Sequence, residues 1–199
     1  MWKLNYILFS IIIFSQSIIA QSKNTRLNLS VISSFELKRI TDSNSTSFTL
    51  PRPHTPLLLF IFLSPECPLS KNYTLTLNQL FNQYNHQVEF YGCVSGSGFS
   101  DTEIKSFINT YKVLYPMIVD KDKRLTKYVA ARVTPEVMLL NRNGEMMYSG
   151  AIDDWIQELG KQKPKASKHY LQDAISACLS NKNVPVKRTM ATGCLINDY

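Results

Sequence analysis

The stretch LLLFIFLSPECPL, residues 57–69, decides how this chain folds. Its first part is a continuous apolar run, which predicts a strand buried on both faces of a sheet. The pattern becomes helical at Cys67, and Pro68 suits the first position of a helix because proline lacks an N–H and has a preset φ angle. The sequence therefore predicts a cysteine at the point where a core strand passes into a helix.

This position favours a reactive thiol. Cys67 would lie at or beside the N-cap, near unpaired backbone N–H groups and the positive end of the helix dipole. Such surroundings lower the pKa of a thiol, and the thiolate is the form that attacks disulfides and binds metals. We therefore expect Cys67 to be ionised, reachable and nucleophilic. The alternative is a buried cysteine at a strand end without a chemical role.

The 199-residue chain has room for one domain with a substantial core. Residues 1–20 combine a lysine, a short apolar run and small residues, which is the pattern of a secretory signal peptide. We expect the rest of the chain to be exported to the periplasm or another extracytoplasmic location, without a stable membrane span. An uncleaved N-terminal anchor is the alternative.

The formal net charge is +7, and part of this excess comes from lysines in the polar stretch 161–168. Basic clusters indicate nucleic-acid binding when aromatic side chains lie among them. No aromatic residue is interleaved between these lysines, so the sequence predicts a solvated loop and no nucleic-acid partner. The three histidines have no metal-ligand spacing, and we expect no resident metal or cofactor.

The mature chain divides into three parts. A polar lead-in segment, residues 21–50, has a weak strand signal near 35–40 and a turn signal near 42–47. Residues 51–180 form the expected main domain. Residues 181–199 form a tail that is expected to be irregular.

Hydrophobic periodicity predicts alternating strands and helices in the main domain. A strand begins at Leu57, and further strands are expected over residues 87–94, 116–119, 136–140 and 145–150. Helices are expected over residues 69–84, 101–111, 122–131 and 169–179, with one or two helical turns in 152–159. The last two strands form a hairpin, because Asn143 and Gly144 between apolar segments are typical of a tight turn.

Two motifs resemble the thioredoxin superfamily: CPLS from Cys67 to Ser70, and the Thr134-Pro135 pair before a strand. Over residues 35–196 the chain is most similar to exported redoxins of the peroxiredoxin-like type, which include alkyl hydroperoxide reductases and thiol-specific antioxidants. The resemblance implies an α/β thioredoxin-like fold, with a central mixed sheet flanked by helices and a C-terminal extension. It also implies a cis Thr134-Pro135 bond facing Cys67, where an ordinary trans proline is the alternative.

The chain departs from the thioredoxin motif and also from the peroxiredoxin motif. Ser70 replaces the second cysteine of a thioredoxin CxxC motif, and its hydroxyl can donate to a thiolate at Cys67 but cannot resolve a disulfide. Compared with a peroxiredoxin, Ser64 fits the hydroxyl position, Phe60 replaces a proline, and Arg132 lies near the expected arginine. The resemblance therefore leaves disulfide exchange and peroxide reduction both open.

A nucleophilic Cys67 needs a second thiol to complete a redox cycle. Cys194 is the first candidate, because the tail could fold back onto the edge of the site. Cys93, at the end of the neighbouring strand, is the second, and a thiol of a partner protein is the third. A structural disulfide between Cys178 and Cys194 is the alternative for the tail.

We expect thiol–disulfide chemistry at a site made of Cys67, Cys194, Ser70, Thr134 and Pro135. The reactants would be protein thiols and disulfides or a peroxide. The sequence leaves the oligomeric state open.

Two functions of other classes also stay open. One is soft-metal binding, with copper as the example, by Cys67 together with Cys194 or Cys93. The other is a redox-silent module that binds a partner in the groove at Pro135. Asp153 and Asp154 could move protons near a thiolate or could simply be solvated.

Overall fold

The computed structural model describes residues 25–41, 43–51 and 53–196. The expected signal peptide, residues 1–20, lies outside these ranges. No helix within the described part of the chain is long and apolar enough to cross a membrane.

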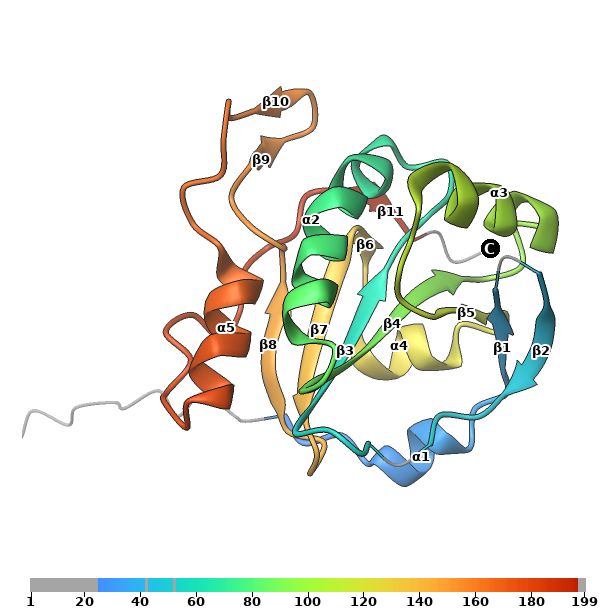
Figure 1. The fold of residues 1–199 in the computed structure, drawn as a ribbon, viewed down its shortest axis with the longest axis horizontal. Helices are drawn as coiled ribbons and strands as arrows, with labels where there is room; N and C mark the ends of the chain where they lie inside the picture. The colour runs from blue at the N-terminus through green and yellow to red at the C-terminus, as the bar shows by residue number, and fades with distance from the viewer. Residues whose placement is uncertain (1–24, 42, 52, 197–199) are drawn as a thin grey trace, which may run out of the picture.

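A seven-stranded mixed sheet forms the centre of the molecule (Figure 1). The strand order is β2-β1-β5-β4-β3-β7-β8, in which β3, β4 and β5 are parallel and the other neighbours are antiparallel. The seven strands are β1 (Leu37–Ile40), β2 (Ser45–Phe48), β3 (Leu57–Phe62), β4 (Val88–Ser95), β5 (Met117–Asp120), β7 (Glu136–Asn141) and β8 (Met146–Gly150). The predicted α/β architecture with a central mixed sheet is confirmed.

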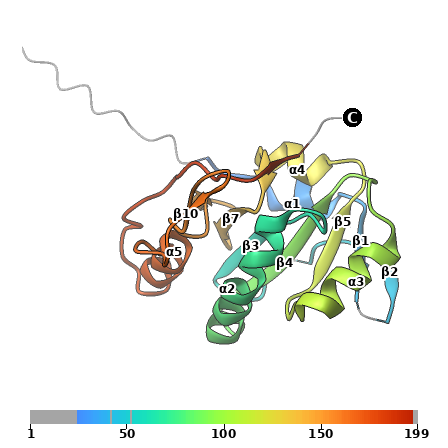
Figure 2. The ribbon, with the colours of Figure 1, turned by 90° about the horizontal axis from the view of Figure 1, so that it is seen from above.

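Helices cover both faces of this sheet, as the view onto the edge where β3 ends makes plain (Figure 2). Side chains from α2, α3 and α5 pack on one face, and side chains from α1 and α4 pack on the other. Within the described residues the helices are α1 (Leu29–Ser33), α2 (Pro68–Tyr84), α3 (Asp101–Tyr111), α4 (Arg124–Val129) and α5 (Tyr170–Leu179).

The apolar run in β3 is continuous because this strand has a helical layer on each side. Leu59 and Ile61 belong to the core cluster beneath α2, whereas Phe60 and Phe62 belong to the cluster beneath α4. All six β3 side chains are buried. A strand with one solvated face would instead alternate apolar and polar residues.

Two parts of the chain differ from the prediction. The lead-in segment contains α1, which was not expected, and β2 begins at Ser45, inside the expected turn. The prediction of helical turns in residues 152–159 is wrong, because this segment forms β9 (Ile156–Glu158), which pairs with β10 (Lys161–Gln162). The backbone of this segment is instead bonded to the residues that follow it, as in the bond from the Lys163 N–H to the Trp155 carbonyl at 2.9 Å.

The tail is also more regular than expected. It first runs beside β8, where the Ser149 N–H donates to the Lys187 carbonyl at 3.1 Å and the Thr189 N–H donates to the Ser149 carbonyl at 3.0 Å. It then forms β11 (Cys194–Leu195), which pairs antiparallel with β6 (Val133–Thr134). The tail therefore crosses the same edge of the sheet at which β3 ends.

Candidate active site

Cys67 lies where β3 leads into α2. It is the N-cap of α2 with an extended backbone (φ −69°, ψ 117°), and Pro68 follows at the start of the helix. The Thr134-Pro135 bond is cis, as expected, and the Thr134 carbonyl accepts a hydrogen bond from the Cys67 thiol at 3.1 Å. The two motifs that are far apart in the sequence therefore meet at one point.

The tail brings Cys194 to this point. In the pairing of β11 with β6, Cys194 lies opposite Thr134, and the Ile196 N–H donates to the Arg132 carbonyl at 2.9 Å. Gly193 permits the approach, because a β-carbon there would lie 2.2 Å from the Thr134 carbonyl oxygen. The Cys194 thiol is consequently within hydrogen-bonding reach of Cys67.

The surroundings of Cys67 act on its ionisation in both directions. Burial raises the pKa of the Cys67 thiol. Hydrogen bonds from the Cys194 thiol and the Ser70 backbone N–H together lower it by more, so the pKa lies below the usual thiol value. The Thr134 carbonyl works against ionisation, because it can accept a hydrogen bond only from the protonated thiol. The site therefore favours a thiolate on Cys67.

The pKa of Cys194 is shifted in the opposite direction. Burial, the hydrogen bond with Cys67 and the repulsion of a neighbouring thiolate raise the pKa of the Cys194 thiol to about 11. The two thiols interact, so their ionisation is a property of the pair, in which Cys67 is the more acidic member. Such a pair has one sulfur that is the better candidate for attack and one that favours the thiol form.

The expectation of a directly reachable Cys67 is wrong, because only 2% of the residue is accessible to solvent. The tail residue Cys194 lies against it. Cys67 nevertheless lines a cavity of about 670 Å³, together with Cys194, Thr134 and the glycine- and serine-rich loop that follows β4. Cys67 therefore borders a space that is large enough for a small reactant.

Ser70 contributes through a different group from the one expected. Its hydroxyl accepts the Ser64 N–H at 3.1 Å, which ties α2 to the end of β3. The group that faces Cys67 is the Ser70 backbone N–H. The position therefore holds the loop and supplies one of the free N–H groups of the first helical turn.

The other two cysteines lie elsewhere. Cys93 is fully buried in the core cluster beneath α4, and burial followed by the nearby Asp120 carboxylate raises the pKa of its thiol. Cys178 lies on α5, partly buried, and burial raises its pKa as well. All four cysteines are free thiols, so the structure does not form the alternative bridge between Cys178 and Cys194.

The two aspartates that follow β8 have structural contacts. Asp153 accepts hydrogen bonds from the Tyr73 hydroxyl at 2.6 Å and from a backbone N–H. Asp154 pairs with Lys163 and caps two backbone N–H groups, and the Lys163 ammonium is the main cause of its lowered pKa. Within the described ranges, no group of three or more His, Cys, Asp or Glu side chains could hold a metal ion.

The sequence analysis did not single out the residues on the far side of the cavity. Lys121 and Lys123, from the turn between β5 and α4, line it together with residues 95–99. The signal was available, because parallel strands end at one edge of a sheet and the loops after β3, β4 and β5 must therefore meet there.

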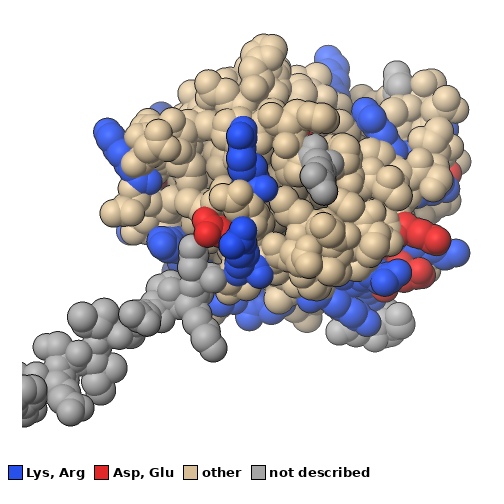
Figure 3. All heavy atoms as spheres, turned by 90° about the horizontal axis from the view of Figure 1, so that it is seen from below, with Lys and Arg blue, Asp and Glu red and all other residues tan. Residues whose placement is uncertain are grey.

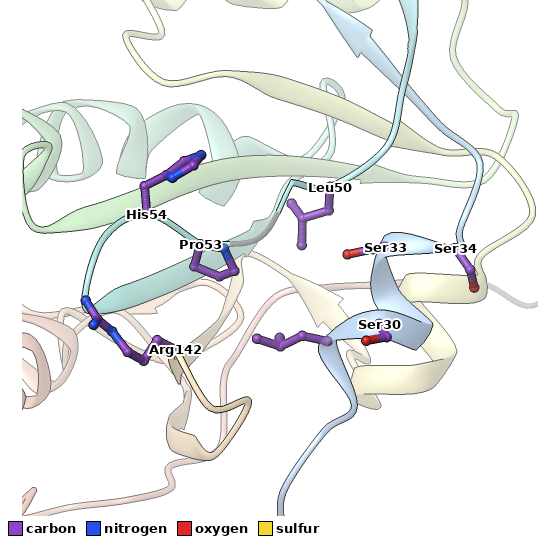
Figure 4. A pocket seen from close by; sticks show the side chains of 8 residues that line it. Ser30, Ser33, Ser34, Leu50, Pro53, His54 and Arg142 are labelled. Carbon is purple, nitrogen blue, oxygen red and sulfur yellow. The ribbon is translucent and has the colours of Figure 1, made fainter.

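A second cavity, of about 800 Å³, lies at the opposite end of the sheet beside α1. Its lining comes from α1, from the segment before β3 and from Arg142 (Figure 4). Lys and Arg side chains are scattered over this end of the molecule and acidic ones are few (Figure 3). The cavity contains no cysteine, so the Cys67 site remains the candidate for chemistry.

Comparisons with solved structures identify the class of fold. An uncharacterized conserved protein of Geobacillus kaustophilus superimposes with a TM-score of 0.75 at 20% identity, over 88% of this chain and 92% of the other. The Xanthomonas campestris bacterioferritin comigratory protein, described with alkyl peroxide reduction activity, gives 0.55 at 16% over 79% and 98%. A secreted disulfide oxidoreductase of Mycobacterium tuberculosis gives 0.50 at 17% over 72% and 94%.

The chain thus has an α/β thioredoxin-like fold of the kind found in redoxins. Its tail forms a C-terminal extension to this fold. No protein-family profile matches the sequence, and no curated protein matches it either.

Proposed function

We propose that this protein is a thiol oxidoreductase in which Cys67 and Cys194 form the redox-active pair. The observation that carries the proposal is the pairing of β11 with β6, which sets Cys194 against Cys67 beside the cis Thr134-Pro135 bond. The unequal ionisation of the two thiols supports distinct roles for them.

The proposed reaction has two steps. The Cys67 thiolate attacks one sulfur of a disulfide, a mixed disulfide forms, and the other sulfur leaves as a thiolate with the electron pair. Cys194 loses its proton to solvent and attacks the Cys67 sulfur, which releases the second thiol and leaves a Cys67–Cys194 disulfide. With a peroxide as oxidant, the first step instead gives a sulfenic acid on Cys67 and an alcohol or water.

The test is a single turnover of the fully reduced protein. Hydrogen peroxide or 2-hydroxyethyl disulfide is added in stoichiometric amount, free thiols are blocked, and disulfide-linked peptides are identified by mass spectrometry. We expect a linked pair of peptides that contain Cys67 and Cys194. The Cys194→Ser variant should stop at the mixed disulfide or sulfenic acid on Cys67, and Cys67→Ser should react with neither oxidant.

Cys178→Ser is the matched control, because Cys178 lies on α5 and outside the lining of the cavity. It should form the Cys67–Cys194 disulfide at the wild-type rate. A wild-type protein whose Cys67 stays reduced, or whose dominant product joins Cys178 to Cys194, would contradict the proposal. Copper that stays bound through gel filtration, with Cys67 unreactive toward both oxidants, would favour the metal-binding function.

An exported location completes the proposal. It rests on the composition of residues 1–20, which resemble a signal peptide. It also rests on the general rule that protein disulfides form and persist outside the reducing cytoplasm. The measurement is the N-terminal sequence of the protein from the producing cell, together with its distribution between cell fractions. An intact N-terminus in the cytoplasmic fraction would overturn this part alone.

A further inference from the structure

The tail is held to the body of the protein at two separate places. Upstream, the Thr189 hydroxyl accepts the Ala151 N–H at 2.9 Å and lies 2.6 Å from the Tyr148 hydroxyl. Downstream, β11 pairs with β6. Met190, between these two places, is 83% exposed. The segment 190–196, here called the flap, is therefore the part that can leave β6 while the tail before it stays on β8.

The flap occupies backbone groups that an extended polypeptide would need near Cys67. A bound strand would pair with Val133 and Thr134, next to the cis bond. In this structure β11 makes that pairing from the same chain, and the Ile196 N–H extends it to the Arg132 carbonyl at 2.9 Å. A polypeptide disulfide can therefore reach Cys67 along this edge only after the flap has left.

The contact between the flap and β6 leaves no space for another backbone between them. Gly193 lies so near that a β-carbon on it would be 2.2 Å from the Thr134 carbonyl oxygen and 3.2 Å from the Pro135 nitrogen. The Cys67 thiol donates to the same Thr134 carbonyl, and Cys67 is 2% exposed. An incoming strand would thus need a carbonyl that already lies against both the flap and the proposed nucleophile.

A small reactant does not need this edge. Cys67 and Cys194 both line a cavity of about 670 Å³, which is within the range of small-molecule sites. Part of its wall comes from the loop after β4, where a β-carbon at Gly98 would meet no atom within 4 Å. A small disulfide in this cavity would lie beside the Cys67 sulfur while the flap stays paired with β6.

We propose that the flap selects the oxidants of Cys67 by size, so that small disulfides react from the cavity while disulfides within polypeptides are held off. This inference rests on the proposed redox function and names its substrate class. In the selected step, the Cys67 thiolate attacks one sulfur of a small disulfide, the S–S bond breaks, and the other half leaves as a thiolate with the electron pair. Cys194 then completes the reaction from the position that it already holds.

The experiment compares two uncharged disulfides that have the same leaving group. The short probe is the disulfide of N-acetylcysteine N-methylamide. The long probe joins two peptides in which a central cysteine is flanked on each side by about five glycine, serine and threonine residues, the usual length of a strand. Both react with the reduced Cys194→Ser protein, which keeps the backbone of β11 and should stop at the mixed disulfide on Cys67.

The measured quantity is the ratio of the short-probe rate to the long-probe rate, followed by mass spectrometry as the adduct on Cys67. Each rate is divided by the rate of the same probe with 2-mercaptoethanol, which removes differences in intrinsic reactivity and diffusion. We expect a ratio of about ten or more, because the long probe reacts only from the fraction of molecules whose flap has left β6.

Two variants of this parent protein loosen the flap in different ways and should each bring the ratio down toward one. Gly193→Ala places a β-carbon against Thr134, and Ile196→Pro removes the N–H that donates to Arg132. Val186→Ala is the matched control, because Val186 lies in the tail before the flap and is 40% exposed, and it should keep the ratio of the parent.

A ratio near one in the parent protein would overturn the inference, and so would a ratio that both flap variants leave unchanged. Either result would leave the redox function intact, since the short probe would still form a mixed disulfide on Cys67. Because the two variants loosen the flap by different means, one of them decides if the other fails to fold. If neither probe reacts with Cys67, the redox function itself is refuted.

Discussion

At the scale of single residues, the site contains two neighbouring thiols whose pKa values are shifted in opposite directions. Cys67 has hydrogen-bond donors around it and a lowered pKa, whereas the pKa of Cys194 is raised to about 11. The donor that Cys194 supplies is also the group that covers Cys67. Reactivity and access are therefore controlled by the same side chain.

Replacing Cys194 separates these two effects. Serine keeps a donor of similar size next to Cys67, and alanine removes it, so the pKa of Cys67 should be higher in Cys194→Ala than in Cys194→Ser. Alkylation of Cys67 by iodoacetamide, followed by mass spectrometry across a pH series, gives the midpoint of each variant. The thiolate fraction rises through the pKa, so the alanine midpoint lies at higher pH. Identical midpoints would mean that the Cys194 donor has no influence.

Gly193 is the residue that lets the tail lie against Thr134. A β-carbon at this position would approach the Thr134 backbone to 2.2 Å, and overpacking of this kind costs about 1–3 kcal/mol. Gly193→Ala should therefore lower the population of the paired tail by roughly 5- to 150-fold, speed alkylation of Cys67 and slow formation of its disulfide with Cys194. Gly98→Ala provides the control, since nothing lies within 4 Å of its added carbon. Equal rates in the two variants would argue against the tail as the cover of Cys67.

At the scale of elements, α2 fixes the position of Cys67 by packing on the sheet. Its buried stripe includes Tyr73, Leu77 and Leu80, whereas Leu75 points to solvent and is 67% exposed. The first helical turn, which supplies the N–H groups near the sulfur, is thus held in place by side chains one to three turns away.

Two alanine substitutions on this helix should lower the free energy of unfolding by very different amounts. Leu77 is fully buried, and Leu77→Ala should lower the free energy of unfolding by about 2–5 kcal/mol through lost burial and a residual cavity. Leu75→Ala changes the same helix at an exposed position and should cost no more than about 0.5 kcal/mol. Urea unfolding followed by circular dichroism measures both. Similar losses would show that α2 is not packed as described.

At the scale of the whole molecule, the tail brings together Cys67 and Cys194, which are separated by nearly two thirds of the chain. It crosses β8 at Ser149, continues to β6, and ends beside the helix start at Cys67. The N-terminal half supplies the proposed nucleophile and the tail supplies its proposed partner. The redox state of the site should therefore change the free energy of unfolding of the whole protein.

The oxidised protein should resist denaturation better than the reduced one. A Cys67–Cys194 disulfide would restrict a loop of more than a hundred residues in the unfolded chain, which contributes at most about 5 kcal/mol. Unfolding in urea with and without a reductant gives the difference. Cys178→Ser should retain it and Cys194→Ser should lose it. An unchanged midpoint on reduction of the wild type would contradict a stabilising link.

Local residue patterns were sufficient for most strands and helices between residues 57 and 150. The core strand at Leu57, the helix that follows Pro68 and the hairpin around Gly144 agree with the structure to within a few residues. Each depends on neighbours in the sequence: a continuous apolar run, a proline at a helix start, and a turn residue with positive φ. The prediction of helical turns in residues 152–159 was wrong because this segment pairs with the strand that follows it, a contact that local periodicity does not reveal.

The sequence by itself determined where the candidate nucleophile lies, since a strand end and a helix start are encoded within a few residues of Cys67. The cis form of the Thr134-Pro135 bond was expected only from the resemblance to the thioredoxin superfamily. Only the tertiary structure decided that β11 covers this nucleophile, that Cys194 rather than Cys93 lies against it, and that the Ser70 hydroxyl is already engaged. A two-residue strand has almost no preference of its own. Its position follows from the groove that accepts it, and that groove exists only when residues far apart in the chain have already packed together.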